Sequence, residues 1–294
     1  MADAIGNKLA KDYHLDVAPA SGALGIKGLE HCDWGMKNRL ARMFRPQSGN
    51  TVMLAFDHGY IMGPTAGLER IDVTIPPLAE HVDVLMATRG ILRSCIDPTG
   101  RQAKCLRVTY DASVVQEEMS AGGGIACDVE NALRMNAECM AVQTFIGAPG
   151  EKNSLELLAR TVDMGTRYGI PTLGVVAVGK QMARDEKFFL LATRMVAETG
   201  AHIVKSYYCE GFERVAAACP VPIVIAGGKK LPEQEALTMA YRAISEGAHG
   251  VDMGRNIFQS EAPVAMTKAI AKVVHEGYTD RQAYEFYLDS KQQG

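Results

Sequence analysis

The 294-residue sequence has no long apolar run, no cysteine spacing of a zinc site and little net charge. No stretch approaches the roughly 18 consecutive apolar residues of a membrane-spanning helix, and no basic segment followed by an apolar core opens the chain. The formal net charge of −3 gives no general attraction to nucleic acid or to an anionic membrane. We therefore expect a cytoplasmic protein that binds neither, and that holds any anionic ligand through local positive groups.

The seven cysteines are interpreted as reduced thiols. They stand at positions 32, 95, 105, 127, 139, 209 and 219. Cys105 and Cys139 fall in strand-like runs, where cysteine behaves as a small apolar residue. The sequence predicts no metal site and no bound cofactor.

Eight short apolar runs alternate with helix-like segments along the chain. The runs begin near Val52, Asp83, Cys105, Met140, Thr172, Ile203, Pro222 and Gly250. Such alternation is typical of a parallel sheet, and eight strands close a barrel. No internal segment is rich enough in Pro, Gly or Ser to divide the chain, and the triple glycine at 122–124 is interpreted as a loop. The predicted fold is α/β: a (β/α)8 TIM barrel over residues 49–294, preceded by an N-terminal extension, residues 1–48, that packs on the barrel.

The segment 232–247 illustrates the covering helices. A proline opens it, a glycine closes it, and Ala236, Leu237, Ala240 and Ala243 fall on one helical face.

Lys205 stands at the end of an apolar run that is typical of a buried strand. An apolar pocket opposes protonation of an amine, and a neutral amine can form an imine with a ketone. The alternative is a solvated lysine just beyond the strand end.

Residues just past the strand ends of such a barrel converge on one mouth. Asp57 follows strand one and could act as a general base or orient a substrate hydroxyl; the alternative is a helix cap or an ion-pair partner. For its neighbour His58 a structural role competes with substrate binding. Arg93 after strand two and Lys180 after strand five either neutralise an anionic ligand or are solvated.

The loops after strands seven and eight are glycine-rich, as phosphate-binding loops of barrels commonly are. The predicted phosphate-binding residues are Gly227, Gly228, Gly254 and Arg255, with Lys230 as a further candidate. Asn256 is expected to cap a short helix beginning near Ile257. The alternative is that both glycine clusters only form tight turns.

The segments 53–59, 203–208, 225–230 and 254–258 resemble the strand-end signatures of class I aldolases with a lysine Schiff base, the group of archaeal fructose-bisphosphate and deoxyribose-phosphate aldolases. The resemblance implies an imine between Lys205 and a phosphorylated ketone, with an acid/base role of the amine as the alternative. It also implies a homo-oligomer, with a ring-shaped decamer among the forms.

Further segments resemble a thiolase branch of this family. They are 33–36, 63–65, 67–72, 88–93 and 251–259, so the similarity covers nearly all of the chain after residue 25. This resemblance implies that the acetyl group of a phosphorylated five-carbon dione passes to coenzyme A, the co-substrate, and leaves dihydroxyacetone phosphate. No motif indicates where coenzyme A binds.

One residue departs from the aldolase pattern. The aldolases carry a tyrosine acid/base on strand four, where this chain has Phe145. A phenyl group cannot transfer a proton, so retro-aldol cleavage is disfavoured relative to acetyl transfer, although Asp57 or Lys180 could supply the proton instead. A sugar-phosphate aldolase and a noncatalytic sugar-phosphate sensor are the alternative functions.

Overall fold

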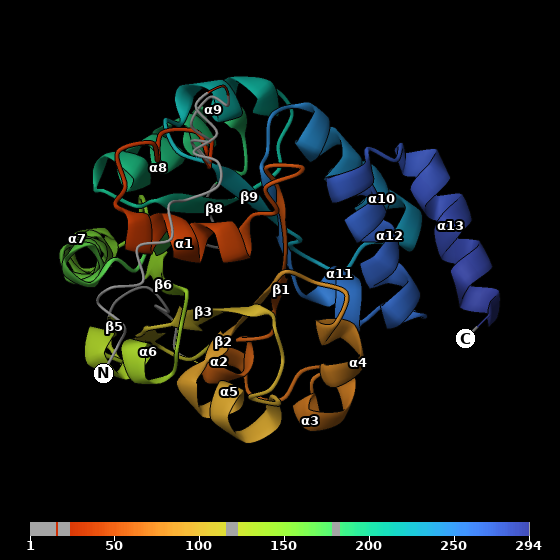
Figure 1. The fold of residues 1–294 in the computed structure, drawn as a ribbon, viewed down its shortest axis with the longest axis horizontal. Helices are drawn as coiled ribbons and strands as arrows, with labels where there is room; N and C mark the ends of the chain where they lie inside the picture. The colour runs from red at the N-terminus through yellow and green to blue at the C-terminus, as the bar shows by residue number, and fades with distance from the viewer. Residues whose placement is uncertain (1–15, 17–23, 116–122, 178–182, 294) are drawn as a thin grey trace, which may run out of the picture.

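Eight parallel strands close into a barrel in the computed structural model, which describes residues 16, 24–115, 123–177 and 183–293 (Figure 1). The strands are β1 (Thr51–Ala55), β2 (Val84–Thr88), β3 (Ala103–Arg107), β6 (Cys139–Thr144), β7 (Thr172–Val176), β8 (Ile203–Tyr207), β9 (Ile223–Ala226) and β10 (Gly250–Met253). Around the barrel they follow the order β1-β2-β3-β6-β7-β8-β9-β10, and β10 pairs with β1 to close it. Each predicted run contributes one strand, so the predicted TIM barrel is confirmed.

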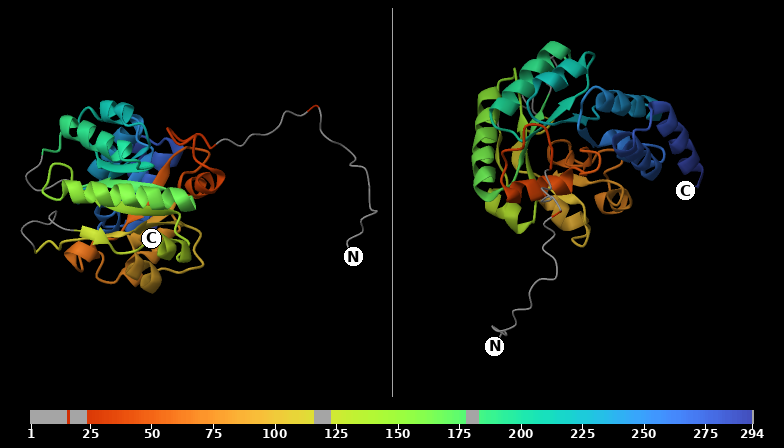
Figure 2. Two further views of the ribbon diagram at one scale, coloured as in Figure 1. Left: turned by 90° about the vertical axis from the view of Figure 1, so that its left-hand side faces the viewer. Right: turned by 45° about the horizontal axis from the view of Figure 1, so that its top comes forward.

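Helices cover the outside of the barrel (Figure 2). They are α2 (Gly59–Met62), α3 (Ile71–Thr74), α4 (Pro76–Ala79), α5 (Arg89–Cys95), α6 (Val129–Arg134), α7 (Glu151–Tyr168), α8 (Glu186–Glu198), α9 (Phe212–Ala218), α10 (Glu233–Ser245), α11 (Arg255–Phe258), α12 (Pro263–Glu276) and α13 (Asp280–Gln293). The helix expected within 232–247 is α10, whose four predicted apolar residues are buried. None of the described helices has the length and apolar character needed to cross a membrane.

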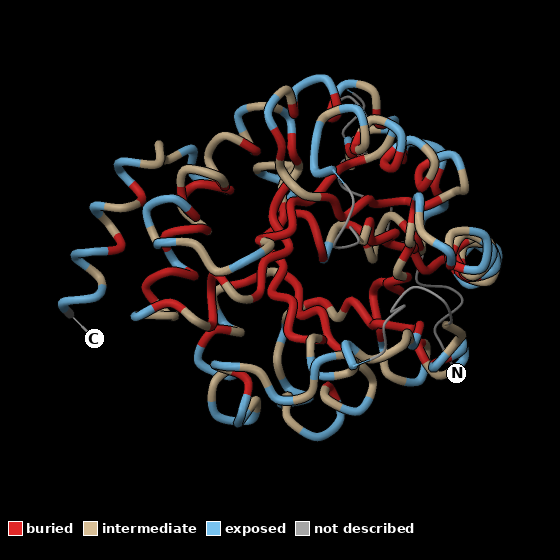
Figure 3. The backbone as a smooth tube through the Cα atoms, turned by 180° about the vertical axis from the view of Figure 1, so that it is seen from behind, coloured by how far each residue is buried: buried red, intermediate tan, exposed pale blue. Residues whose placement is uncertain are grey.

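The strands separate two apolar cores by their period-two alternation. On β1, Val52 and Leu54 face outward and pack under the helices, whereas Met53 and Ala55 face the barrel interior. Every barrel strand contributes to the buried tube around the axis, while the helices alternate buried and exposed residues (Figure 3). The strands therefore read as continuous apolar runs, as expected of a sheet buried on both faces.

One end of the barrel is covered by the segment that precedes β1. The helix α1 (Trp34–Met43) crosses this end in Figure 1, and its Met36, Leu40 and Met43 belong to the interior core. The Asp33 carboxylate caps α1 by accepting a hydrogen bond from Met36 N at 2.8 Å. The 1–48 extension as a whole stays a prediction, because residues 1–15 and 17–23 lie outside the described ranges.

A short hairpin follows β3 that the sequence did not predict. Its strands β4 (Thr109–Asp111) and β5 (Gly123–Ile125) pair antiparallel, so Gly123 and Gly124 belong to a strand and their interpretation as loop was wrong. A Cβ at Gly124 would lie 2.6 Å from the Tyr110 hydroxyl oxygen. Glycine is required there by the close approach of the facing tyrosine ring, which has no local sequence signal.

The Asp83 carboxylate, just before β2, contacts three separate segments of the chain. Asp83 accepts hydrogen bonds from Arg45 Nε at 2.6 Å and from Val52 N at 2.8 Å, and contacts His275 Nε2 on α12 at 2.9 Å. Burial opposes its ionisation, but these partners outweigh burial and lower the pKa of Asp83. The ionised form of Asp83 therefore stabilises the fold.

We expect Asp83→Asn to lower the free energy of unfolding by about 2–3 kcal/mol at neutral pH, because charge-assisted hydrogen bonds are lost. The deficit relative to wild type should shrink as the pH falls below 3.8, the usual value of this carboxyl, because wild-type Asp83 is then protonated as well. Urea unfolding at several pH values measures this.

The control is Asp72→Asn, which removes an exposed ion pair with Arg70 and should leave unfolding unchanged. A deficit for Asp83→Asn that stays constant with pH would contradict the assigned role.

Candidate active site

The interior changes from apolar to charged at the carboxyl ends of the strands. Asp57, Arg107 and Lys205 each stand two residues beyond an inward-facing apolar residue, so alternation turns them into the barrel. Asp252 on β10 joins them, and all four are 9% exposed or less. The predicted pair Lys205 and Asp57 thus shares one buried charged layer with two further residues.

The amine of Lys205 lies inside the barrel rather than in solvent. Its Nζ is 2.9 Å from Asp252 Oδ2 and 3.8 Å from Met86 Sδ on the opposite strand β2. The Asp252 contact lies at ion-pair distance without hydrogen-bond angles, so it counts as an ion pair. The expected apolar pocket is therefore wrong: an aspartate on β10, two strands away around the barrel, faces the amine, which no local pattern around Lys205 could indicate.

Burial raises the pKa of Asp252, and the nearby Lys205 ammonium only partly offsets it. A carboxylate with a raised pKa accepts a proton readily, and this one lies within reach of the ammonium. Asp252 is therefore the nearby group that is placed to take up a proton from the amine.

Asp57 is held by an arginine. Arg107 Nε donates to Asp57 Oδ2 at 2.9 Å, and both side chains are buried. Burial opposes ionisation, but Arg107 and Lys205 outweigh it and lower the pKa of Asp57. The structure thus realises the ion-pair alternative for Asp57, which leaves the carboxylate ionised and able to accept hydrogen bonds from a substrate.

His58 is half-buried beside the loop that follows β10. Burial lowers its pKa to about 4, so the imidazole is neutral at neutral pH. Its ring meets Phe258 edge-on with centroids 5.6 Å apart, and a Cβ at Gly254 would lie 2.6 Å from His58 Cε1. These contacts support a structural role, in which His58 fixes the position of the Gly254 loop.

The two glycine-rich loops are joined by one side chain. Asn256 donates from Nδ2 to Gly227 O at 2.7 Å and accepts at Oδ1 from Leu231 N at 2.8 Å. The expected capping role of Asn256 is wrong, since α11 begins at Arg255 and Gly254 occupies the cap position. A Cβ at Gly254 would also lie 2.4 Å from Ala55 O, so close packing against β1 requires this glycine.

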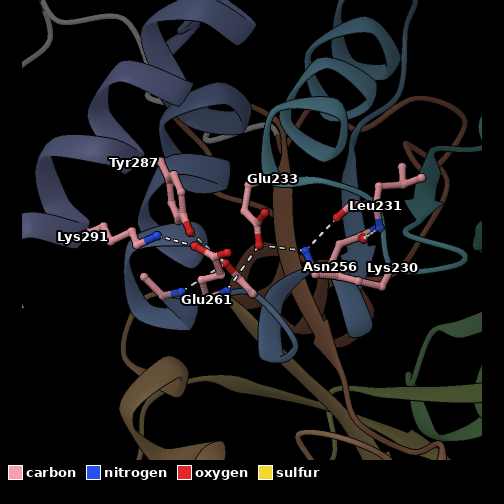
Figure 4. A network of polar contacts seen from close by, with 9 residues as sticks. Lys230, Leu231, Glu233, Asn256, Glu261, Tyr287 and Lys291 are labelled. Atoms are coloured by element: carbon pink, nitrogen blue, oxygen red, sulfur yellow. Dashed lines mark hydrogen bonds and ion pairs between the residues drawn. The ribbon is translucent and has the colours of Figure 1, made fainter.

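The basic residues of these loops differ in their partners. Arg255 Nε is buried without a hydrogen-bond partner among the described residues. Lys230 Nζ instead contacts Glu233 Oε1 at 2.8 Å and Leu231 O at 2.7 Å (Figure 4). Gly228 adopts a φ of +67°, which favours glycine. The free donor of Arg255 is the stronger candidate for an anion, because Lys230 already has two acceptors.

The remaining predicted residues are less central. Arg93 is exposed on α5, and Phe145 is half-buried just after β6 with its backbone N donating to Ser154 Oγ at 3.0 Å. Lys180 lies outside the described residues. Neither Arg93 nor Phe145 belongs to the charged layer.

Sequence reasoning missed two members of the charged layer, Arg107 and Asp252. Both interrupt apolar strands, in Cys-Leu-Arg-Val and Val-Asp-Met-Gly, as Lys205 interrupts its own. The criterion that singled out Lys205, applied to every strand, would have found them.

With this geometry in place, known proteins can be compared. The profile of the DeoC/LacD family aldolases matches residues 51–260. An archaeal fructose 1,6-bisphosphate aldolase superposes with a TM-score of 0.74 at 24% identity, over 82% of this chain and 100% of that one. A fructose-bisphosphate aldolase from Slackia heliotrinireducens superposes with a TM-score of 0.77 at 17% identity, over 94% and 95% of the chains. At these identities the structures establish a shared fold.

Two relatives are much more similar in sequence. An uncharacterized aldolase of Pasteurella multocida is 56% identical over 292 residues, 99% of this chain and 100% of that protein. The 3-hydroxy-5-phosphonooxypentane-2,4-dione thiolase of Photorhabdus laumondii is 53% identical over 293 residues, again 99% and 100%. Because the profile matches most of the chain and these relatives match it end to end, the chain belongs to the DeoC/LacD family of aldolases.

Proposed function

We propose that the protein transfers the acetyl group of 3-hydroxy-5-phosphonooxypentane-2,4-dione to coenzyme A, giving acetyl-coenzyme A and dihydroxyacetone phosphate. The observation that carries the proposal is the end-to-end identity of 53% to a relative of that name. The buried amine of Lys205, 2.9 Å from Asp252, supports it chemically.

Lys205 attacks the substrate carbonyl beside the phosphorylated carbon and, after loss of water, forms an iminium ion. Asp252 is within reach to take the ammonium proton that must leave before the attack. The loops around Gly227, Gly228, Gly254 and Arg255 hold the phosphate. With the phosphate in these loops and the reacting carbonyl at Lys205, the acetyl end of the substrate points away from the phosphate loops.

The thiol of coenzyme A then adds to the acetyl carbonyl and gives up its proton to water, which returns one proton when the enamine carbon is protonated. The bond between the acetyl carbon and the hydroxyl-bearing carbon breaks, and its electron pair passes into the iminium to form an enamine. Protonation of the enamine carbon and hydrolysis release dihydroxyacetone phosphate and free Lys205. Atoms and electrons balance without an oxidant or a metal, and the ionised Asp57 is available to orient the substrate hydroxyl.

The setting of the reaction follows from the same proposal. Phosphorylated autoinducer-2 breakdown would end with this step, in the cytoplasm, where the free state of all seven cysteines is expected. A homo-oligomer, with a ring-shaped decamer as one form, remains a prediction from the family resemblance.

We expect Lys205→Met to lower acetyl-coenzyme A formation at least about a thousandfold, since the covalent step is lost. Borohydride should trap dihydroxyacetone phosphate on the peptide that carries Lys205 in the wild type and not in this variant. Lys187→Met, an exposed change on α8, serves as the control with full activity and trapping.

Wild-type protein that forms no acetyl-coenzyme A but cleaves fructose bisphosphate would make the protein an aldolase instead. Retained turnover without any adduct would show that the amine acts as an acid or base.

We also expect Arg255→Gln to raise KM for the phosphorylated dione about ten- to a hundredfold, because a charged donor to the phosphate is lost. The value of kcat should change little, since the phosphate is held equally in the ground and transition states. Arg281→Gln, an exposed change on α13, is the matched control. Unchanged KM in steady-state kinetics would remove Arg255 from the phosphate site.

A further inference from the structure

A cavity of about 190 Å³ opens at the barrel mouth beside the charged layer and away from the phosphate loops. The residues that matter here are Tyr60, Arg89, Arg107, Tyr110, Ala126 and Cys127. They come from the loops after β1 and β2, from the end of β3 and from the β4–β5 hairpin. The reaction steps at Lys205 and the phosphate loops leave this cavity without a role.

Its place in the barrel is set by the strand order. In the closed eight-stranded order, β3 lies directly opposite β9, and β2 lies directly opposite β8. Gly227 follows β9, Lys205 is on β8, and Arg107 ends β3. Consider a substrate whose phosphate lies on the β9 loop and whose carbonyl beside the phosphorylated carbon lies at Lys205. Its acetyl end then points toward the cavity beside β3.

Arg107 is one of the residues that line this cavity, and one of its N–H donors is unused among the described residues. Its Nε is occupied by Asp57 at 2.9 Å, whereas its Nη1 is buried and has no hydrogen-bond partner within the described ranges. A guanidinium carries five N–H donors in a fixed fork, so one edge can hold Asp57 while another faces a ligand. A buried donor left unpaired is costly, which indicates that a ligand oxygen completes it.

The residues around Arg107 hold its guanidinium in a fixed position at the cavity. Tyr60 donates from its hydroxyl to Asp111 Oδ2 at 2.6 Å, and the Arg107 guanidinium lies over the Tyr60 ring at 5.7 Å from its centroid. These contacts fix the wall and the guanidinium in place before a ligand arrives. Ala126 is exposed at the rim, so the cavity is open to a long ligand arm from solvent.

We propose that this cavity receives the acetyl end of the substrate and the thiol of coenzyme A, and that Arg107 Nη1 donates a hydrogen bond to the acetyl oxygen. The inference rests on the proposed function and deepens it. Thiol addition turns this carbonyl oxygen into an alkoxide, which the guanidinium stabilises. When the carbon–carbon bond breaks, the oxygen returns to a carbonyl in the thioester, and the electron pair moves toward the iminium at Lys205.

The two halves of the reaction can be measured apart. Exchange of hydrogen for deuterium at the hydroxymethyl carbon of dihydroxyacetone phosphate needs only the enamine at Lys205 and the phosphate loops. Acetyl-coenzyme A formation also needs the acceptor cavity. The ratio of the two rates therefore reports on the cavity alone.

We expect Arg107→Lys to lower acetyl-coenzyme A formation about a hundred- to a thousandfold, as loss of an oxyanion donor does. Deuterium exchange should fall much less than acetyl transfer, because the ammonium still pairs with Asp57 but cannot also reach the acetyl oxygen. The matched control is Arg101→Lys, the same exchange at an exposed position just before β3. Thermal melting verifies that each variant is folded.

A second variant needs no change inside the barrel. Ala126→Trp adds bulk at the exposed rim of the cavity, and we expect it to raise KM for coenzyme A at least about tenfold with exchange retained.

Different results would overturn the role of the cavity and the proposed acetyl transfer. Equal losses of transfer and exchange in Arg107→Lys would mean that Arg107 only positions Asp57, and acetyl transfer unimpaired in both variants would also overturn the inference. Wild-type protein that exchanges deuterium but forms no acetyl-coenzyme A would refute the proposed function, and the inference with it.

Discussion

Two buried ion pairs at one end of the barrel interior, Lys205 with Asp252 and Arg107 with Asp57, are the constraint on which the rest of the structure depends. Removing charges from water costs several kcal/mol per ion unless each finds a partner, so these four side chains, three on strands and Asp57 just past β1, must be held close together. A closed barrel does this because its inward positions converge, and the apolar interior below them keeps water out. The chemistry of the amine is therefore inseparable from the closure of the sheet.

The mouth around this layer has two unlike halves. On one side, Asn256 links the loops after β9 and β10 through hydrogen bonds to Gly227 O and Leu231 N, which makes a rigid and narrow seat. On the other side, the hairpin after β3 and the loop after β2 leave an open cavity. Arg107 lines it, and Arg107 Nη1 has no hydrogen-bond partner among the described residues. A rigid binding site is suited to a phosphate group that does not react. The open cavity is suited to the end of the substrate where bonds form and break.

This division explains how one family scaffold can serve two reactions. Retro-aldol cleavage and acetyl transfer both leave a carbanion that an iminium at Lys205 can delocalise, so the proposed phosphate site and the lysine would serve both reactions. The reactions differ at the carbon that departs: an aldol must lose a hydroxyl proton, while an acyl group must accept a nucleophile and pass through an oxyanion. Arg107, which lines the open cavity, has a donor to offer to such an oxyanion, so in the proposed mechanism this half of the mouth favours acyl transfer.

The sequence by itself determined the eight strands, because each is buried on both faces and therefore forms an unmistakable apolar run. It also singled out Lys205 and the glycine loops, whose residue types are unusual in their local setting. The hairpin, the bridging role of Asn256 and the partners of Lys205 and Asp57 were decided only by the tertiary structure. Each of these depends on which strand ends meet across the barrel, and a contact between residues far apart in the chain leaves no periodicity or spacing to detect.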